Sequence, residues 1–352
     1  MKVLYLLSRV QQAQMSKIER GEESDDHIYG MLRLRRMGVE SGYLEIEQFL
    51  PARACNFLRT HVLSVYWAHA PLFFKFLSYD VILSPTAFGS QLLHALYPFR
   101  KPKWVMLDFS VLGLIGEGRT WKQRIMRFLA RRADGIIAVD KMEERLLKER
   151  FPEKGDSITF IPLSVDAGFS RPGQDIPEKG NIFSPGRDPG RDFKTLFKAL
   201  EGLDCRLFIT TRPWTLKKLQ PVPSFVNCVD LTHQEFLHEY DKAQIVIIPL
   251  DTRSGLNNAM GGSTVLEAMS MGKAIIATRT PMMSSYITDG VNGILVPEGD
   301  ADALRRAVVS VLDDPTKRAS LGKKAREFAV NECSPDVFTE RLFEYFKRIV
   351  SA

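Results

Sequence analysis

A chain of 352 residues is long enough for about two α/β domains, and its 45% hydrophobic content is enough for buried cores. No apolar run reaches the roughly 18 residues of a membrane-spanning helix, and the apolar start is too short for a signal peptide. The net charge of +6 comes entirely from residues 1–165. That distribution favours an anionic partner of the first half, with ordinary solubilising charge as the alternative.

Cysteine usage indicates a reducing compartment. The four cysteines lie far apart and have no metal-binding spacing: Cys55, Cys205, Cys228 and Cys333. We interpret them as reduced thiols of a cytoplasmic protein.

The first half alternates short apolar runs with longer segments, a pattern that predicts parallel strands and connecting helices. Strands are expected at 3–7, 42–46, 80–84, 104–107, 135–139 and 158–161, and helices at 27–37, 119–132, 141–151 and over the residues that end at 96. The polar segment 8–26 is predicted to be a loop at the carboxyl end of the first strand, where open α/β sheets bind ligands.

Asp108 follows the strand predicted at 104–107. The side chain is therefore placed either to meet a substrate or to cap the segment that follows, and the sequence leaves both interpretations open.

Two segments of the first half raise the question of membrane contact. Residues 49–78 are dense in aromatic side chains, which are more often core residues than membrane contacts. Residues 119–132 (RTWKQRIMRFLARR) hold six basic residues and no acidic one, with Trp121, Ile125, Phe128 and Leu129 on one helical face. Such a helix is a candidate for an anionic membrane surface, although packing against the sheet with a solvated basic face is slightly favoured.

The second half repeats the alternation after a linker at 171–180, which is rich in proline, glycine and charge. Strands are expected at 181–184, 205–210, 227–229, 244–250, 274–277 and 293–296, with helices at 193–200, 234–243, 301–313, 315–331 and 336–350. Arg187 and Arg191 flank a glycine-proline loop between the first of these strands and its helix. Two guanidinium groups on one loop suit a diphosphate, because each can bind it bidentately.

The stretch 261–278 (GGSTVLEAMSMGKAIIAT) reads as loop, helix, turn and strand. Gly261 and Gly262 would let a ligand approach the backbone, and Ser263 or Thr264 is a suitable N-cap. The helix N-terminus attracts anions, so phosphate is the expected ligand. Glu267 is a single carboxylate in an otherwise apolar helix, and ribose hydroxyl groups would satisfy it. An ordinary β-α-β loop is the alternative.

The chain from Asp134 onward resembles the retaining GT-B glycosyltransferases, chiefly family 4, group 1. The segments that carry the resemblance are DGIIAVDKMEERLL, ITFIPLSVDAGFSRP, SPGRDPGRDFKTLFKAL, the 261–278 stretch and DGVNGILVPEGDADAL, whereas residues 1–133 match only in layout. The resemblance implies two doubly wound Rossmann-like α/β domains facing a cleft. The expected domains are 1–168 for the acceptor and 180–334 for the nucleotide-sugar, with a helix at 335–352 that crosses back to the first.

The resemblance also implies site residues. It assigns Gly186, Arg187 and Arg191 to the donor diphosphate, backbone amides of Gly262, Ser263, Thr264 and Val265 to a phosphate, and Glu267 to the donor ribose. Asp108 falls near a position that faces the sugar in many members. One departure is clear: the first acid of the E-x7-E pair falls on Ala259, where Asn258 is a substitute hydrogen-bonding group.

We therefore expect a retaining hexosyltransferase that moves a sugar from a UDP- or GDP-sugar to an acceptor hydroxyl. The resemblance implies no metal or other cofactor, and no Asp-x-Asp motif lies in a suitable loop. The basic first half favours a lipid-linked acceptor in polysaccharide or glycolipid assembly, with peripheral association at the inner membrane face. The alternatives are a non-catalytic nucleotide- or lipid-binding partner and a sugar-nucleotide epimerase; nucleic acid is not expected as a partner.

Overall fold

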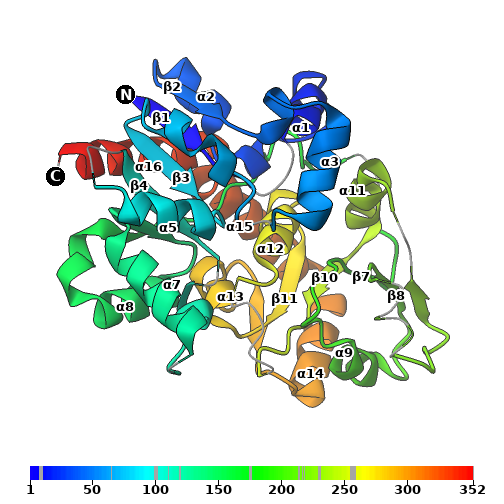
Figure 1. Cartoon of the computed structure of the whole chain (residues 1–352). Coiled ribbons are helices and arrows are strands. Elements are labelled where there is room, and N and C mark those ends of the chain that lie inside the picture. The colour runs from blue at the N-terminus through cyan, green and yellow to red at the C-terminus, as the bar shows by residue number, and fades with distance from the viewer. Residues whose placement is uncertain are drawn as a thin grey trace. The chain divides into compact units, whose positions relative to one another are not determined.

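The structure, a computed structural model, describes residues 1–351 except 8–10, 65, 99–101, 110, 119, 174–176, 213, 214, 216, 218, 229, 230 and 254–258. It divides into two compact units (Figure 1). Unit 1 comprises Met1–Pro162 and Pro335–Ala352, and unit 2 comprises Leu163–Ser334. Each unit is built on its own six-stranded sheet.

The division falls at residue 162, earlier than the predicted boundary at 168 and the predicted linker at 171–180. The segment after Pro162 is tied into unit 2 by backbone hydrogen bonds. The amide of Val165 donates to the carbonyl of Cys333 at 2.8 Å, and the amide of Gly173 donates to the Asp241 carboxylate at 2.9 Å. Composition alone indicated a linker between domains here, whereas these hydrogen bonds join its described start to unit 2.

The sheet of unit 1 is entirely parallel and has the order β2-β1-β3-β4-β5-β6. Its inner strands are buried along their length, which explains their uninterrupted apolar sequences. The strands are β1 (Lys2–Tyr5), β2 (Glu40–Tyr43), β3 (Val81–Ser84), β4 (Lys103–Asp108), β5 (Gly135–Ala138) and β6 (Ile158–Phe160).

The helices of unit 1 connect these strands in sequence. They are α1 (Gln11–Glu19), α2 (Met31–Arg36), α3 (Ala52–His61), α4 (Phe73–Phe76), α5 (Phe88–Leu96), α6 (Val111–Ile115), α7 (Trp121–Arg132), α8 (Lys141–Arg150) and α16 (Pro335–Ser351). Short 3-10 helices are η1 (Asp26–Ile28), η2 (Ile46–Gln48), η3 (Ala70–Leu72) and η4 (Pro152–Ser157).

Two predictions for the start of the chain are wrong. The segment predicted as a loop contains α1, whose sequence QQAQMSKIE has too few apolar residues to show a helical period. The helix predicted at 27–37 is divided into η1 and α2 by Gly30, which has φ 74°. A Cβ at Gly30 would lie 2.5 Å from Thr339 Oγ1, so glycine is required where α16 packs against this turn.

The last helix, α16, belongs to unit 1, as the resemblance implied. Tyr345 donates its hydroxyl hydrogen bond to the carbonyl of Ser157 at 2.6 Å, and Arg348 donates to Thr159 Oγ1 at 2.7 Å. Its apolar face is buried through Phe338, Leu342 and Phe346. The chain therefore leaves unit 1 after β6 and returns to it at residue 335.

The sheet of unit 2 is also parallel, with the order β12-β11-β10-β7-β8-β9. Its strands are β7 (Asn181–Ser184), β8 (Arg206–Ile209), β9 (Val226–Cys228), β10 (Ile245–Ile248), β11 (Ala274–Thr278) and β12 (Ile294–Val296). Its helices are α9 (Phe193–Leu200), α11 (His233–Lys242), α12 (Gly262–Ser270), α13 (Pro281–Tyr286), α14 (Ala301–Leu312) and α15 (Pro315–Glu332). Two parallel sheets with connecting helices confirm the predicted pair of doubly wound Rossmann-like domains.

Two further properties of the structure concern disulfides and helices that could span a membrane. None of the four cysteines forms a disulfide. Among the helices of the described residues, none combines the length and apolar character needed to cross a bilayer.

Candidate functional site

The first turn of α12 is the centre of the candidate site. The helix begins at Gly262 with Gly261 as its N-cap at φ 79°, so the predicted caps Ser263 and Thr264 lie inside the helix. That prediction failed because the Thr264 side chain has another use: its Oγ1 accepts a hydrogen bond from Arg191 Nη2 at 3.0 Å. Gly272, with φ 64°, follows the end of the helix as predicted.

The glycines at the start of α12 lie against two methionine side chains, and Gly261 also has a positive φ that favours glycine. A Cβ at Gly261 would lie 2.8 Å from Met283 Cε, and one at Gly262 would lie 2.3 Å from Met282 Cε. Both glycines are buried. Close approach of a ligand to the backbone here stays a prediction.

The backbone amides of the first turn divide into two groups. Gly262 donates to the carbonyl of Ala259 at 3.3 Å, and Val265 donates to the carbonyl of Gly261 at 2.9 Å. The amides of Ser263 and Thr264 are among those that an α-helix cannot pair within itself. Because Ser263 is exposed, these amides and the helix dipole offer an anion site at this position.

Arg191 lies directly behind this turn. Its side chain has 0% exposure, and its Nη2 donates to Asp188 Oδ2 at 3.0 Å as well as to Thr264. Its Nε and Nη1 have no hydrogen-bond partner among the described residues. Burial lowers the pKa of the guanidinium, and the Asp188 carboxylate opposes that shift. A buried guanidinium with two unused donor groups is a strong attraction for an anion.

Arg187 and Arg191 differ in their exposure to solvent. The Arg187 side chain is exposed at the loop between β7 and α9. Gly186, which precedes Arg187, has φ 117°, and a Cβ there would come within 2.0 Å of Arg191 Nη2. The predicted pair therefore consists of one accessible guanidinium and one that acts from beneath α12.

Glu267 lies one turn further into α12 and is half-buried. Its Oε2 accepts a hydrogen bond from the Tyr240 hydroxyl at 3.3 Å, and the same hydroxyl lies 3.5 Å from the carbonyl oxygen of Thr264. Burial, followed by the charge of Glu267, raises the pKa of Tyr240 well above its usual value, so this hydroxyl remains a donor. Sequence reasoning missed Tyr240, because an aromatic residue in a helix is normally assigned to the core.

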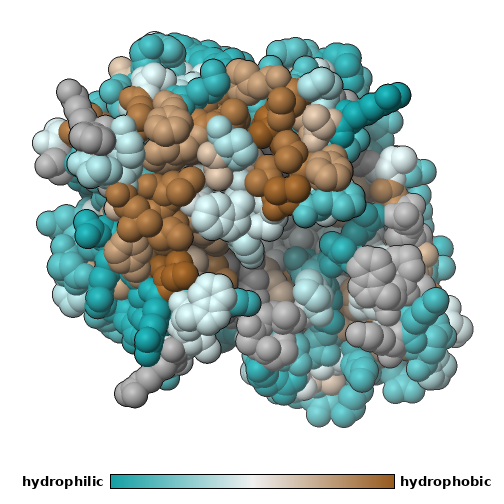
Figure 2. Space-filling model, viewed as in Figure 1, coloured by the Kyte–Doolittle hydropathy of each residue, from teal (hydrophilic) through white to brown (hydrophobic). Residues whose placement is uncertain are grey.

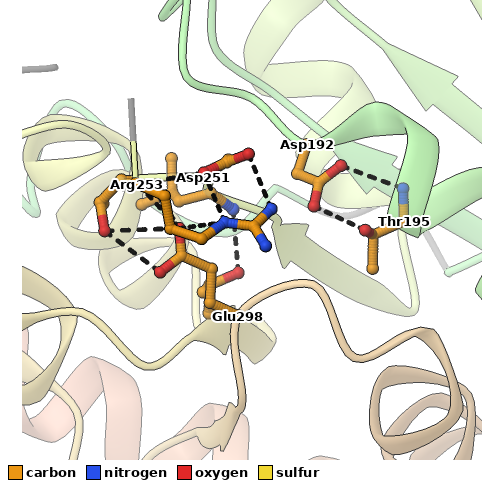
Figure 3. A network of polar contacts seen from close by, with 8 residues as sticks. Asp192, Thr195, Asp251, Arg253 and Glu298 are labelled. Atoms are coloured by element: carbon orange, nitrogen blue, oxygen red, sulfur yellow. Dashed lines mark hydrogen bonds and ion pairs between the residues drawn. The ribbon is translucent and has the colours of Figure 1, made fainter. Parts of the chain in front are cut away.

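A polar network joins residues 251–253, which follow β10, to Glu298 (Figure 3). The Glu298 carboxylate accepts hydrogen bonds from the amides of Thr252 and Arg253, and Arg253 Nη2 pairs with Asp251 Oδ2 at 2.9 Å. The hydrogen bond from Arg253 lowers the pKa of Asp251 to about 2. Glu298 was also missed, since a carboxylate in a Pro-Glu-Gly turn gives no functional signal. Asn258, predicted to contact the donor, lies outside the described residues.

Asp108 belongs to unit 1 and has the capping role that the sequence left as one of two interpretations. It has no exposed surface, and its Oδ1 accepts from the amide of Val111 at 2.5 Å at the start of α6. Asp140 and Glu143 are buried beside it. Burial and the charges of Asp108 and Asp140 raise the pKa of Glu143 to about 10. A catalytic role for Asp108 stays a prediction.

The basic helix α7 packs against the core of unit 1. This is the interpretation that the sequence slightly favoured. Met126 and Leu129 are buried, and Ile125 and Phe128 pack against the same core. Only Trp121 of the predicted apolar face is exposed. Arg119, where the predicted helix began, lies outside the described residues.

Within the described part of the chain, no group of three or more His, Cys, Asp or Glu side chains is arranged to hold a metal ion. Independence from metal stays a prediction.

Comparison with known proteins finds similarity to glycosyltransferases within unit 2. Residues 229–328 match the family described as glycosyl transferases, group 1. A GDP-mannose-dependent monoacylated alpha-(1-6)-phosphatidylinositol monomannoside mannosyltransferase of Corynebacterium glutamicum is 31% identical over 32% of this chain. The lipopolysaccharide core biosynthesis glycosyltransferase LpsE of Rhizobium meliloti is 29% identical over 22% of it. These matches span 29% and 23% of the two curated relatives.

Solved structures extend the likeness to the whole fold. HepE of Anabaena, solved in complex with UDP, has a TM-score of 0.72 at 14% identity and covers 99% of this chain and 100% of its own. The sucrose-phosphate synthase of Thermosynechococcus elongatus has a TM-score of 0.73 at 17% identity, with 100% of both chains covered. Together with the family match, these similarities confirm the resemblance to group 1 glycosyltransferases of the GT-B fold.

Proposed function

We propose that this chain, which resembles the group 1 glycosyltransferases in its fold and in residues 229–328, transfers a hexose from a nucleotide-sugar to an acceptor hydroxyl. The observation that carries the proposal is Arg191. Its buried guanidinium has two nitrogens without a partner among the described residues and lies against the first turn of α12. A diphosphate bound at that turn would be attracted by this buried positive charge and by the helix N-terminus.

The proposed role of each residue follows from whether it is exposed or buried. Arg187 and the amides of Ser263 and Thr264 contact the phosphates, because the Arg187 and Ser263 residues are exposed. Arg191 acts through Thr264 and strengthens the positive potential of the helix N-terminus. Glu267 accepts hydrogen bonds from the ribose, and Tyr240 holds its carboxylate in position.

The chemistry that suits this arrangement is transfer with retention of configuration and without a protein nucleophile. As the bond between the sugar carbon and the phosphate oxygen breaks, the leaving phosphate takes the proton of the acceptor hydroxyl. The acceptor oxygen then bonds to the same face of the sugar. Fixed positive charge at the leaving diphosphate stabilises the transition state, because that is where negative charge develops. We propose that no metal ion takes part.

UDP and GDP are the favoured nucleotides. HepE, solved with UDP, supports the first, and the GDP-mannose-dependent relative supports the second. The acceptor is proposed to be lipid-linked, because the positive net charge lies in the first half and the relatives' names include phosphatidylinositol and lipopolysaccharide products. A cytoplasmic protein associated with the inner membrane face would fit that acceptor.

Donor turnover tests this proposal. Purified protein is incubated with UDP-glucose or GDP-mannose and a bacterial lipid extract, with and without a chelator, and released nucleotide is measured. We expect nucleotide release with one donor, unchanged by the chelator, and almost none in the Arg187→Ala variant. Arg206→Ala, an exposed arginine on β8 paired with Glu178, is the matched control and should keep full activity.

The products separate the alternatives. A sugar attached to lipid supports the proposal, and a nucleotide-sugar of altered configuration identifies an epimerase. Donor binding without turnover in any extract would contradict transferase activity and favour a non-catalytic nucleotide-binding partner.

A further inference from the structure

Exposed aromatic side chains are concentrated in one part of unit 1. Among the described residues, every exposed phenylalanine, tyrosine and tryptophan lies between residues 49 and 121: Phe49, Phe57, Tyr66, Trp67, Phe74 and Trp121. Leu50, Val62, Leu93 and Leu96 add exposed aliphatic groups within the same range. Unit 2 has Val291 and Val330 as its exposed large apolar residues over the described range. The concentration is therefore a property of this segment and not of the surface in general.

Contacts within the segment join several of these side chains to neighbouring elements. Lys75 Nζ on α4 lies 4.5 Å from the ring centre of Phe49, and Tyr66 stacks on Phe88 of α5 at 5.5 Å. Trp67 lies so close to α5 that a Cβ at Gly89 would come within 2.2 Å of its ring. Figure 2 shows hydrophobic residues, in brown, gathered over the region where Figure 1 draws α5 and continuing toward α3. We call Phe49, Phe57, Tyr66, Trp67, Phe74 and Leu96 the aromatic face.

Charge in the chain segment around the aromatic face is predominantly positive. Residues 49–132 contain twelve basic and three acidic residues, and residues 49–79 contain no acidic residue. One of the three acids, Asp108, is fully buried. Exposed basic residues stand on the elements that carry the exposed rings: Arg53 on α3, Lys75 on α4, and Lys122 and Arg124 next to Trp121 on α7.

We infer that the aromatic face docks on a bilayer that contains anionic lipid. Aromatic rings are favoured at the level of the headgroups, and lysine and arginine are attracted to anionic lipid within the screening distance. A second copy of this chain fits less well, because a two-fold contact would set these basic residues against their own kind.

The proposed membrane contact lies on the aromatic face and not on the helix at 119–132 that the sequence indicated. The apolar side of α7 is covered by the core of unit 1, so α7 contributes Trp121 and basic residues only at its edge. The rings of residues 49–78 divide in a way that the sequence does not reveal: Phe73 and Phe76 are buried, whereas Phe57 and Phe74 point to solvent. This docking deepens the proposed function, since a bilayer surface would supply a lipid-linked acceptor to unit 1.

Vesicle co-sedimentation tests the inference. The full chain is mixed at low salt with vesicles of phosphatidylglycerol and phosphatidylcholine in equal parts, or of phosphatidylcholine alone. The variant carries Phe57→Ser, Phe74→Ser and Leu96→Ser, whose residues are 60%, 77% and 65% exposed. The control carries Val291→Ser and Val330→Ser, at 50% and 41% exposure in unit 2. We expect the mixed vesicles to retain wild type and control, and the partition coefficient of the variant to fall about tenfold or more.

Two readouts keep the outcome clear. Trp67 and Trp121 are exposed in the free protein, so mixed vesicles should protect tryptophan fluorescence from acrylamide, and this protection should be smaller in Trp67→Phe. Unchanged retention of the triple variant, or equal retention by vesicles of phosphatidylcholine alone, would overturn the inference. So would a dimer in sedimentation velocity that the triple variant dissociates, because the face would then bind a second copy. Nucleotide binding by unit 2 is measured separately, so failure of the docking leaves the donor site untouched.

Discussion

Tyr240 places a hydroxyl group between Glu267 Oε2 and the carbonyl oxygen of Thr264, at 3.3 and 3.5 Å. The ring is fully buried and packs edge-on against Phe183 and Phe236, with centroid distances of 5.1 and 5.3 Å. Packing therefore fixes the ring, and the hydroxyl fixes the carboxylate. The site therefore depends on Tyr240, which contacts no ligand in the proposed arrangement but orients Glu267, which does.

Tyr240→Phe removes this hydroxyl and keeps the ring. We expect the free energy of unfolding to fall by about 1 kcal/mol and the affinity for UDP or GDP to fall about fivefold, because Glu267 loses its orientation. Affinity for inorganic pyrophosphate, which has no ribose, should stay unchanged. Isothermal titration with both ligands measures the difference.

The control is Tyr286→Phe, a buried tyrosine of unit 2 whose hydroxyl oxygen accepts a hydrogen bond from the amide of Leu163 at 2.9 Å. It should lose stability without changing either affinity. An equal loss of nucleotide and pyrophosphate binding in Tyr240→Phe would show that Tyr240 supports the fold and does not position Glu267.

At the scale of elements, the junction between β4, β5 and their helices buries three carboxyl groups. Asp108 caps α6, and Asp140 caps α8 through the amide of Glu143 at 2.7 Å. Glu143 lies between them, within hydrogen-bonding reach of Asp108. Because its pKa is raised to about 10 by burial and by these charges, Glu143 is protonated in the folded protein near neutral pH.

The sign of the pH effect follows from this shift. The pKa of Glu143 is about 4.3 in an unfolded chain and about 10 in the folded one, so folding takes up a proton between these values. The stability linked to this proton is complete below the unfolded pKa and is lost as pH rises toward the folded pKa. The free energy of unfolding should decrease by up to about 1.4 kcal/mol per pH unit across this window.

Glu143→Gln keeps a hydrogen-bond donor toward Asp108 and removes the titrating proton. We expect its urea unfolding free energy to vary less with pH than that of wild type, and to exceed the wild-type value above neutrality. Glu144→Gln on the same helix, paired with Lys148 at 2.9 Å and partly exposed, should follow the wild-type pH profile. Parallel profiles for wild type and Glu143→Gln would contradict the assignment of a protonated Glu143.

At the scale of the whole molecule, the sequence predicts the alternation of strands and helices well, because buried parallel strands such as β10 and β11 are continuous apolar runs. It fails for α1, whose polar sequence shows no helical period. The return of the chain to unit 1 through α16 came from family resemblance, since no local pattern shows which unit an amphipathic helix will join.

The sequence predicted that the candidate site binds an anion, but it did not predict which of its side chains are buried and which are exposed. A basic loop and a helix N-terminus indicated an anion site, yet the loop sequence does not distinguish buried Arg191 from exposed Arg187. The same limit applies to the aromatic face, because composition does not tell which rings face solvent. Both properties depend on tertiary packing.

A calorimetric titration of the full chain with UDP, GDP, ADP and TDP tests the proposed donor site most directly, in wild type, Arg191→Met and Arg206→Met. We predict micromolar binding of UDP or GDP by wild type and Arg206→Met. Arg191→Met should bind at least about tenfold more weakly, which is about 1.4 kcal/mol, because the positive charge behind the phosphate site is lost. Circular dichroism should show that Arg191→Met keeps its fold, because Asp188, which loses its ion-pair partner, is partly exposed. Absence of binding by all four nucleotides, or equal binding by Arg191→Met, would contradict a diphosphate site at the start of α12.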